Sequence, residues 1–147
     1  MDVSYEEDFI AISQVKARYC RFLDTKDWAA YTDLFIEDFV LDTSTAGGAP
    51  PIKGREAAVA YIRKSVETAK TAHHVHNGEI QVEGDTAKVI WAMQDRVIWG
   101  PDRRDIGEVG HTGYGQYHET YVRQGGRWRI AASQLRYLIY DSHPREG

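Results

Sequence analysis

Three of the six histidines of this 147-residue chain lie within five residues, in the segment 73–77 (HHVHN). In an extended strand, His73 points to one face, and His74 and His76 point to the other. An imidazole titrates near neutral pH, so a histidine whose tautomer is fixed by a carboxylate can act as a general base. His74 and His76 can alternatively bind a metal with His118, but the sequence offers no firm further ligand. We therefore expect acid/base chemistry with no metal and no cofactor.

A carboxylate interrupts the apolar face of a strand expected at residues 86–99. Apolar side chains alternate along this segment, and Asp95 falls in register with Trp91, Met93 and Val97. A buried carboxylate is costly unless it is paired or hydrogen-bonded. If the alternation ends early, Asp95 faces water. If it continues, Asp95 is a cavity carboxylate that can orient a histidine or a substrate hydroxyl.

Tyr19 and Asp24 form a third candidate group. Tyr19 lies on the apolar face of a predicted helix, and Asp24 lies five residues later, where that helix ends. Five residues correspond to about 140° around a helix axis, so the two side chains share a face only if the helix end unwinds. The residues alone favour the structural interpretation, in which Tyr19 is a core tyrosine and Asp24 is a helix terminator.

The elements that must position these groups are helices in the first half of the chain. Apolar residues recur at spacings of three and four and predict helices at residues 5–23, 28–35 and 55–69. A Gly/Pro-rich segment at 43–51 (TSTAGGAPP) predicts a surface loop, which is a candidate lid for a pocket.

Strands dominate the second half. They are expected at residues 39–41, 73–83, 86–99, 112–123 and 128–140. Gly84-Asp85 and the segment 124–126 (QGG) predict two tight hairpin turns, and residues 100–110 read as a connection. Helices followed by antiparallel strands indicate the α+β class, in one domain spanning residues 1–147. A strongly bent sheet over the helices would leave a cavity.

Composition excludes several classes of function. The chain has 18 Lys and Arg residues and 22 Asp and Glu residues, which give a net charge of −4. It therefore lacks the excess of basic residues with which proteins bind nucleic acid. No apolar stretch approaches the ~20 residues of a membrane span, and no signal-peptide pattern is present. A single cysteine, Cys20, fits a reducing compartment. We expect a cytoplasmic protein that contacts neither nucleic acid nor membrane.

Three strings make the chain recognisable: KARYCRFLDTKDW, HHVHNGEIQVEGDTAKVIWAMQD and GYGQYHETYVRQGGRWRI. Together they resemble the SnoaL-like branch of the NTF2-like superfamily. The chain looks closest to bile acid 7α-dehydratase-like proteins, with scytalone dehydratase and hexachlorocyclohexane dehydrochlorinase as more distant relatives. The resemblance implies an NTF2-like (cystatin-like) cone in which three N-terminal helices pack on a strongly curved antiparallel sheet that encloses one pocket.

The resemblance also implies which residues form the site. The positions that match the family's catalytic groups are Tyr19, Asp24, His73 and Asp95. The positions expected to bind substrate are His76, Trp91, Met93, Tyr117 and Tyr137. The dehydratases carry an arginine late in the last strand, whereas the best register here places Tyr137 there, with Arg136 on the opposite face unless a bulge shifts it. This departure argues against an anionic or coenzyme A-bearing substrate.

The expected function is a cofactor-independent lyase. It would eliminate water from an alicyclic or polycyclic hydroxy-ketone such as a steroid, with Tyr19, Asp24 and His73 as the acid/base site. An enzyme like ketosteroid isomerase or a polyketide cyclase is one alternative, and a non-catalytic ligand-binding or dimerisation module is another. The expected partners are a small apolar or polycyclic substrate and further copies of the chain, as a homodimer or homotrimer that pairs through the outer face of the sheet.

Overall fold

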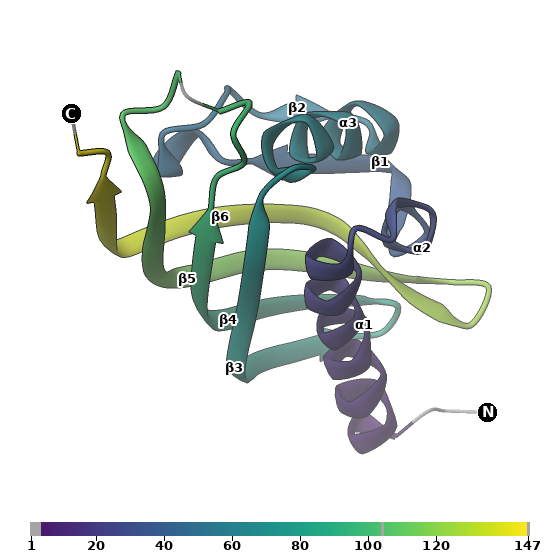
Figure 1. Cartoon of the computed structure of the whole chain (residues 1–147). Coiled ribbons are helices and arrows are strands. Elements are labelled where there is room, and N and C mark those ends of the chain that lie inside the picture. Colours follow the sequence, from purple (N-terminus) through teal and green to yellow (C-terminus); the bar gives the residue numbers. More distant parts are fainter. Residues whose placement is uncertain (1–3, 104, 147) are drawn as a thin grey trace.

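The computed structural model describes residues 4–103 and 105–146, which form helices followed mainly by long strands (Figure 1). The elements, in chain order, are α1 (Tyr5–Thr25), α2 (Trp28–Thr32), β1 (Phe35–Asp42), the 3₁₀ turn η1 (Ser44–Ala46), β2 (Ile52–Lys53), α3 (Arg55–Val66), β3 (Lys70–Glu83), β4 (Thr86–Ile98), β5 (Glu108–Gln124) and β6 (Arg127–Pro144). The predicted α+β class with three helices is confirmed.

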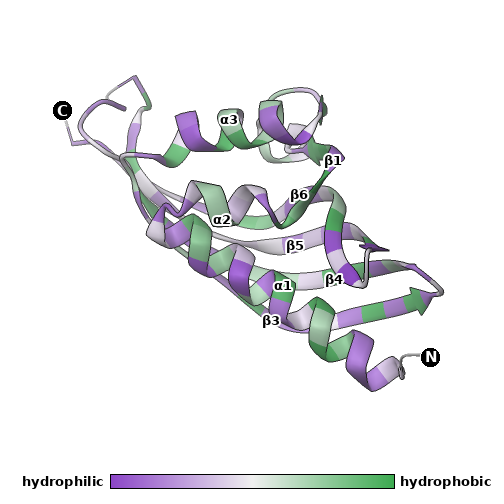
Figure 2. Cartoon of the chain, turned by 90° about the vertical axis from the view of Figure 1, so that its right-hand side faces the viewer, coloured by the Kyte–Doolittle hydropathy of each residue, from purple (hydrophilic) through white to green (hydrophobic). Residues whose placement is uncertain are grey.

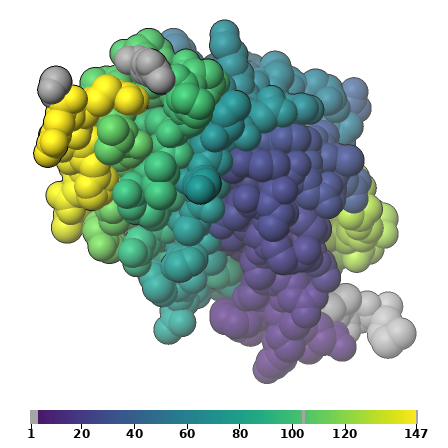
Figure 3. All heavy atoms as spheres, in the orientation of Figure 1, coloured from purple at the N-terminus to yellow at the C-terminus, as the bar shows by residue number. Residues whose placement is uncertain are grey.

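The six strands form one curved sheet in the order β2-β1-β6-β5-β4-β3. Every neighbouring pair is antiparallel except β1 and β6, which run parallel. The helices lie on the same side of the sheet (Figure 2). In the space-filling view, α1 and the segments that follow it cover the strands behind them (Figure 3). The site must therefore lie between the concave face of the sheet and the helices.

Helix α1 is fixed at both ends by local sequence. At its start, the Ser4 hydroxyl accepts a hydrogen bond from the Glu7 backbone N–H, and the Glu7 carboxylate accepts one from the Ser4 N–H, which together form a capping box. At its end, Lys26 adopts the left-handed conformation with φ of 61°, and its N–H bonds to the carbonyl of Leu23. The helix therefore stops just after Asp24, whose side chain is left at the junction with the sheet.

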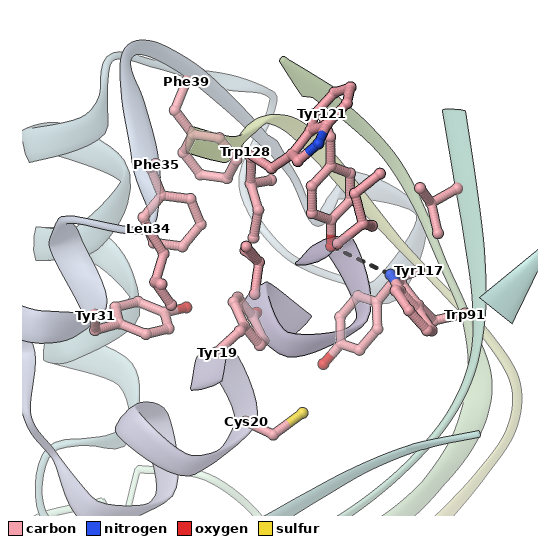
Figure 4. Packing of buried hydrophobic residues seen from close by; sticks show 14 of the residues in the cluster. Tyr19, Cys20, Tyr31, Leu34, Phe35, Phe39, Trp91, Tyr117, Tyr121 and Trp128 are labelled. Atoms are coloured by element: carbon pink, nitrogen blue, oxygen red, sulfur yellow. Dashed lines mark hydrogen bonds between the residues drawn. The ribbon is translucent and has the colours of Figure 1, made fainter. Parts of the chain in front are cut away.

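Aromatic rings fill the space between α1 and the sheet. Figure 4 shows Tyr19 between Tyr31 and Tyr117, at centroid distances of 5.2 and 5.8 Å. Below them, the fully buried ammonium of Lys16 lies 2.9 Å from the Glu119 carboxylate. Pairing satisfies both buried charges, because an isolated one would be strongly destabilising. The rings and this ion pair form a closely packed layer that borders the cavity.

Two helices end earlier than the sequence predicts. Helix α2 ends at Thr32 rather than Phe35, and β1 begins at Phe35, where it pairs with Ile130 of β6. Similarly, α3 ends at Val66, and β3 already begins at Lys70. In both places, pairing with a strand that is distant in the sequence overrides the local helical periodicity. The two predicted hairpin turns are confirmed between β3 and β4 and between β5 and β6.

A β-bulge interrupts the pairing of β5 with β6. Tyr114 is opposite Ile139, whereas Gly115 is opposite Tyr137, so Leu138 is an extra residue on β6. An extra residue reverses the alternation of side chains beyond it. As a result, Tyr137 and Tyr140 both line the concave side, although they are three positions apart in the sequence.

Candidate active site

A cavity of about 370 Å³ lies between the concave face of the sheet, α1, α3 and the loop after β1. Five of the predicted site residues line it: Tyr19, His73, Asp95, Tyr117 and Tyr137. The predicted lid segment also contributes to the wall, through Thr43 and the stretch 46–48. Whether this segment moves as a lid stays a prediction.

Asp24 and His73 form a dyad at the junction of α1 and β3. His73 Nδ1 lies 2.7 Å from Asp24 Oδ1, and the His73 backbone N–H donates to Oδ2 at 2.8 Å. The Thr71 hydroxyl adds a third bond to the carboxylate, at 2.9 Å. Burial disfavours the charged carboxylate, but these bonds outweigh burial and hold the pKa of Asp24 below its usual value. Asp24 does not itself line the cavity, so it acts through His73.

Asp95 lies beside His73 on the concave face. The two residues are directly opposite each other on β4 and β3, and Asp95 is only 3% exposed. The alternation of β4 thus continues through Asp95. Its carboxylate accepts a hydrogen bond from the Tyr137 hydroxyl on β6. Burial opposes ionisation of Asp95, but the contacts with His111 and Tyr137 keep its pKa below the usual value; burial and the Asp95 charge raise the pKa of Tyr137.

A glycine makes the contact between β4 and β6 possible. Gly113 lies on β5, between Asp95 and Tyr137, and a Cβ atom there would lie 2.3 Å from Tyr137 Cε1 and 2.4 Å from Asp95 Oδ1. Any other residue would push the two side chains apart. Gly113 is therefore part of the site although it has no side chain.

Tyr19 and Tyr117 form the deep end of the cavity. Both are nearly buried, and the ammonium of Lys16 lies 3.6 Å from the centroid of each ring. Burial raises the pKa of both hydroxyls, so each remains a neutral O–H at ordinary pH. Neutral phenols at a cavity wall can donate hydrogen bonds to a carbonyl oxygen or to a developing oxyanion.

Three residues expected to bind substrate do not reach the cavity. Trp91 and Met93 are buried in the core beneath it, where Trp91 Nε1 donates to the Tyr121 hydroxyl at 3.2 Å. His76 is exposed on β3 and lies outside the cavity lining. The alternation of the segment 73–77 predicts that His73 and His76 point to different faces of the strand, and the structure agrees. The resemblance implied instead that His76 binds substrate, but its side chain does not reach the cavity.

The structure shows which of two neighbouring residues of the last strand, Arg136 or Tyr137, faces the cavity. Tyr137 faces the cavity, whereas Arg136 is exposed and donates to Gln134 at 2.7 Å. The bulge does not reverse this, because the extra residue, Leu138, follows both positions.

Sequence reasoning missed two ionisable residues of the cavity wall, Glu108 and His111. Both are buried at the start of β5 and line the cavity. Residues 100–110 were read as a connection and the strand was expected from Thr112, which hid this part of its alternation. A signal was available, because His111 is separated from Gly113 and Tyr117 by even numbers of positions, two and six, and so shares their face of the strand.

Within residues 4–103 and 105–146, no group of three His, Cys, Asp or Glu side chains is arranged to hold a metal ion. His74 and His76 are both exposed. Over the same residues, no helix has the length and apolar character needed to cross a membrane.

The sequence of the chain matches the family model of the SnoaL-like domain over residues 6–134. The chain belongs to the SnoaL-like family. Its fold is that of the NTF2-like proteins, with the cystatin-like cone that the resemblance implied. The closer resemblance to bile acid 7α-dehydratase-like proteins stays a prediction.

Individual SnoaL-like relatives carry the names of different enzymes. "Probable cyclase FGR4" of Gibberella zeae is 26% identical over an alignment of 138 residues, and the match covers 88% of this chain and 90% of the relative. The crystal structure of a "Putative Scytalone Dehydratase" from Novosphingobium aromaticivorans has a TM-score of 0.73 at 22% identity and covers 95% of each chain. A hexachlorocyclohexane dehydrochlorinase (LinA) has a TM-score of 0.76 at 16% identity, over 94% of this chain and 88% of the other. The two structural likenesses establish the fold alone.

Proposed function

We propose that this chain is a cofactor-independent lyase that eliminates water from a neutral alicyclic or polycyclic hydroxy-ketone. The observation that carries the proposal is the Asp24–His73 dyad at the wall of a largely apolar cavity, with Asp95 directly opposite His73 on the next strand. Ionisable groups clustered in this way at a cavity wall are typical of functional sites rather than of packing alone.

The dyad gives His73 the properties of a general base. Because Nδ1 lies 2.7 Å from the Asp24 carboxylate, Nδ1 carries the ring proton and Nε2 keeps its lone pair. The Asp24 carboxylate also stabilises the imidazolium that forms when His73 accepts a proton. His73 would remove a proton alpha to the substrate carbonyl, or vinylogous to it, and Tyr19 would donate a hydrogen bond to the developing enolate.

The cavity favours a compact, uncharged substrate. Its volume is near the lower end of the roughly 300–1,000 Å³ of typical small-molecule sites. Aliphatic side chains such as Leu41, Ile62 and Leu135 line it, together with the carboxylates of Asp95 and Glu108. Arg103 also lines the cavity, but it lies 3.5 Å from the Asp105 carboxylate and is outnumbered by the two negative charges. This balance disfavours an anionic ligand, which agrees with the absence of an inward arginine at position 137. A steroid-like ring system is one member of the proposed class.

A cyclase or isomerase is the second candidate, supported by the curated relative whose name is a probable cyclase. Such an enzyme would use the same base and the same oxyanion donors. Only the fate of the hydroxyl separates the two reactions, because elimination releases water whereas cyclisation or isomerisation need not.

The test is a panel of cyclic hydroxy-ketones, including hydroxysteroids, incubated with enzyme in D₂O. Mass spectrometry reports water loss, and NMR reports exchange of the α-proton. We expect both in the wild type, and a loss of at least about a hundredfold in both for His73→Ala. His74→Ala, which changes an exposed histidine on the outer face, is the matched control. Full activity of His73→Ala would refute the proposed base, and cyclised product without water loss would favour the second candidate.

We also propose that copies of the chain pair through the outer face of the sheet. Ile98, Tyr114 and Ile139 are exposed there, at 44%, 38% and 54%. Exposed apolar residues in a group mark interaction surfaces. Light scattering of the wild type and of Ile139→Glu would test this, with a monomeric wild type as the contrary result.

A further inference from the structure

A second carboxylate–histidine pair lies in the same cavity, on the far side of Asp95 from the dyad. Glu108 and His111 both lie at the start of β5, three positions apart in the sequence. His111 Nε2 lies 3.4 Å from Asp95 Oδ1 and 3.4 Å from the Tyr137 hydroxyl oxygen. His111 Nδ1 lies 3.5 Å from Glu108 Oε1. Each ring nitrogen therefore faces a carboxylate.

Glu108 is held in place as a charged group. Its carboxylate accepts hydrogen bonds from Trp99 Nε1 at 2.9 Å, from the Tyr140 hydroxyl at 2.7 Å and from the Ser142 hydroxyl at 2.5 Å. Burial opposes ionisation, but these three donors and the nearby His111 keep the pKa of Glu108 below its usual value. A fixed negative charge thus stands behind His111, on the side away from Asp95.

The groups that face His111 come from three strands. Asp95 lies on β4 and Glu108 on β5, while Tyr137 and Tyr140 lie on β6. The Tyr140 ring stacks on the imidazole, with centroids 4.5 Å apart and planes inclined by 27°. The ring of His111 is therefore fixed in orientation, with a carboxylate at each end.

Two buried atoms of this group lack a hydrogen bond of normal geometry, His111 Nδ1 and Asp95 Oδ1. Such atoms are rare in folded proteins, and a specific one calls for an explanation. A histidine kept for packing would be expected to use its nitrogens in contacts near 2.9 Å. Here the contacts are 3.4–3.5 Å, which is the loose geometry of catalytic groups that tighten when a ligand is bound.

We propose that Tyr137 donates the proton that converts the leaving hydroxyl to water, and that His111 resupplies Tyr137. The inference rests on the proposed elimination. As the substrate C–O bond breaks, its electron pair stays on the leaving oxygen. The Tyr137 hydroxyl turns away from Asp95 and transfers its proton to that leaving oxygen, which becomes water. In this proposal His111 enters the step as an imidazolium with one N–H toward each carboxylate; it passes the Nε2 proton to the Tyr137 oxygen and is left as a neutral imidazole with its Nδ1–H toward Glu108. His73 takes the α-proton, whose bonding electrons form the new C=C bond. Proton exchange with solvent then returns both histidines to their starting states.

The resupply explains why Tyr137 needs a partner. Burial and the Asp95 charge raise the pKa of Tyr137, so a bare phenolate would be strongly disfavoured in this wall. A proton source 3.4 Å from the phenolic oxygen removes the need for that intermediate. Asp95 keeps both partners in place, because it contacts the Tyr137 hydroxyl and His111 Nε2 with different oxygens.

The decisive experiment compares two leaving groups on one carbon skeleton, hydroxide and chloride. Hydroxide must be protonated to leave, whereas chloride need not be, and both reactions require the base His73. We expect His111→Gln and Tyr137→Phe to slow water elimination about a hundredfold or more, and chloride elimination by less than tenfold. The matched control is His118→Gln, which changes a histidine on the outer side of the same strand. Thermal unfolding of each variant shows whether it is folded, and Tyr137→Phe carries the test if His111→Gln is not.

Equal losses on both leaving groups in folded variants would overturn the inference and leave His111 as a packing residue. That result leaves the proposed function standing, since His73→Ala would still abolish both eliminations. A wild type that neither exchanges the α-proton nor eliminates either group would instead refute the proposed function, and the inference with it.

Discussion

The cavity holds two carboxylate–histidine pairs that are built in opposite ways. In Asp24–His73, the carboxylate and the ring nitrogen are 2.7 Å apart, and the carboxylate accepts bonds from backbone and side chain. In Glu108–His111, the corresponding distance is 3.5 Å, and the carboxylate is held by three side-chain donors instead. The first pair is already closed, whereas the second has contacts that a bound substrate can tighten.

The two pairs also depend on different parts of the fold. Asp24 is placed by the end of α1, where the left-handed Lys26 stops the helix and its ammonium donates to the Thr71 hydroxyl at 3.0 Å. Glu108 and His111 are placed by the start of β5, where an irregularity in the pairing with β6 between Glu108 and Gly110 allows both side chains to face the cavity. The difference suggests a division of labour, in which a preformed base acts opposite an adjustable proton donor.

The largest effect is expected from opening the closed pair. Asp24→Asn keeps the shape of the side chain but removes the charge that fixes the tautomer of His73 and stabilises its imidazolium. We expect turnover to fall by about a thousandfold, while the variant still binds substrate. Steady-state kinetics of elimination checks this, with Asp38→Asn, an exposed aspartate on β1, as the control. Turnover within tenfold of wild type would show that the dyad is not the base.

A smaller loss is expected from opening the contact between Asp95 and Tyr137, which lies beside the adjustable pair. In Gly113→Ala, the new methyl group would meet both Tyr137 and Asp95, so their hydrogen bond must open. We expect water elimination to slow by about ten- to a hundredfold, with a loss of about 1–3 kcal/mol in the free energy of unfolding from overpacking. Gly107→Ala is the matched control, because nothing lies within 4 Å of its Cβ position. Unchanged kinetics in Gly113→Ala would separate the Asp95–Tyr137 contact from the reaction.

Acid stability tests the carboxylates of both pairs without any substrate. The carboxyl pKa values of Asp24 and Glu108 lie below their ordinary values of 3.8 and 4.5, because hydrogen bonds to each carboxylate outweigh burial. The unfolded chain therefore binds more protons as the pH falls, so the stability these groups contribute is complete above about pH 5 and is lost below it. The slope of the free energy of unfolding against pH reports the difference in bound protons between the unfolded and folded states. We expect Asp24→Asn and Glu108→Gln each to reduce this difference by up to one proton. Urea unfolding between pH 3 and 7 measures the slope, and a slope equal to that of the wild type would contradict the assigned direction.

The smallest effect is expected at Thr71, which gives the closed pair its third bond. Thr71→Val removes the hydroxyl that donates to Asp24 at 2.9 Å, while the two bonds from His73 remain. We expect a loss of about 0.5–1.5 kcal/mol in the free energy of unfolding and a few-fold loss of turnover. Thr120→Val on the outer face of β5 is the comparison. A loss of turnover as large as that of Asp24→Asn would mean that the dyad depends on all three bonds together.

How far the sequence predicts the site depends on the kind of element that carries each residue. Asp95 is recognisable from the alternation of one strand, because a period of two fixes the face of every residue. Asp24 is not, since its direction depends on how α1 ends at Lys26, and helical periodicity carries no information about that end. His111 was missed because the start of β5 follows a charged, glycine-rich connection. The same limit explains Phe35, which has a helical spacing but becomes a strand residue by pairing with Ile130.

The extra residue on β6 has a consequence for how such a pocket can diverge. If the pairing of β5 and β6 were regular with the same residues present, Ile139 would point inward and Tyr140 outward, because a shift of one residue exchanges the two faces of a strand. Glu108 would then lose the phenol that donates to it at 2.7 Å. Insertion or deletion of a single residue near Leu138 can therefore exchange a polar for an aliphatic wall at one end of the cavity. In this chain, a change in length at the bulge would therefore alter the cavity wall as much as a substitution of a lining residue.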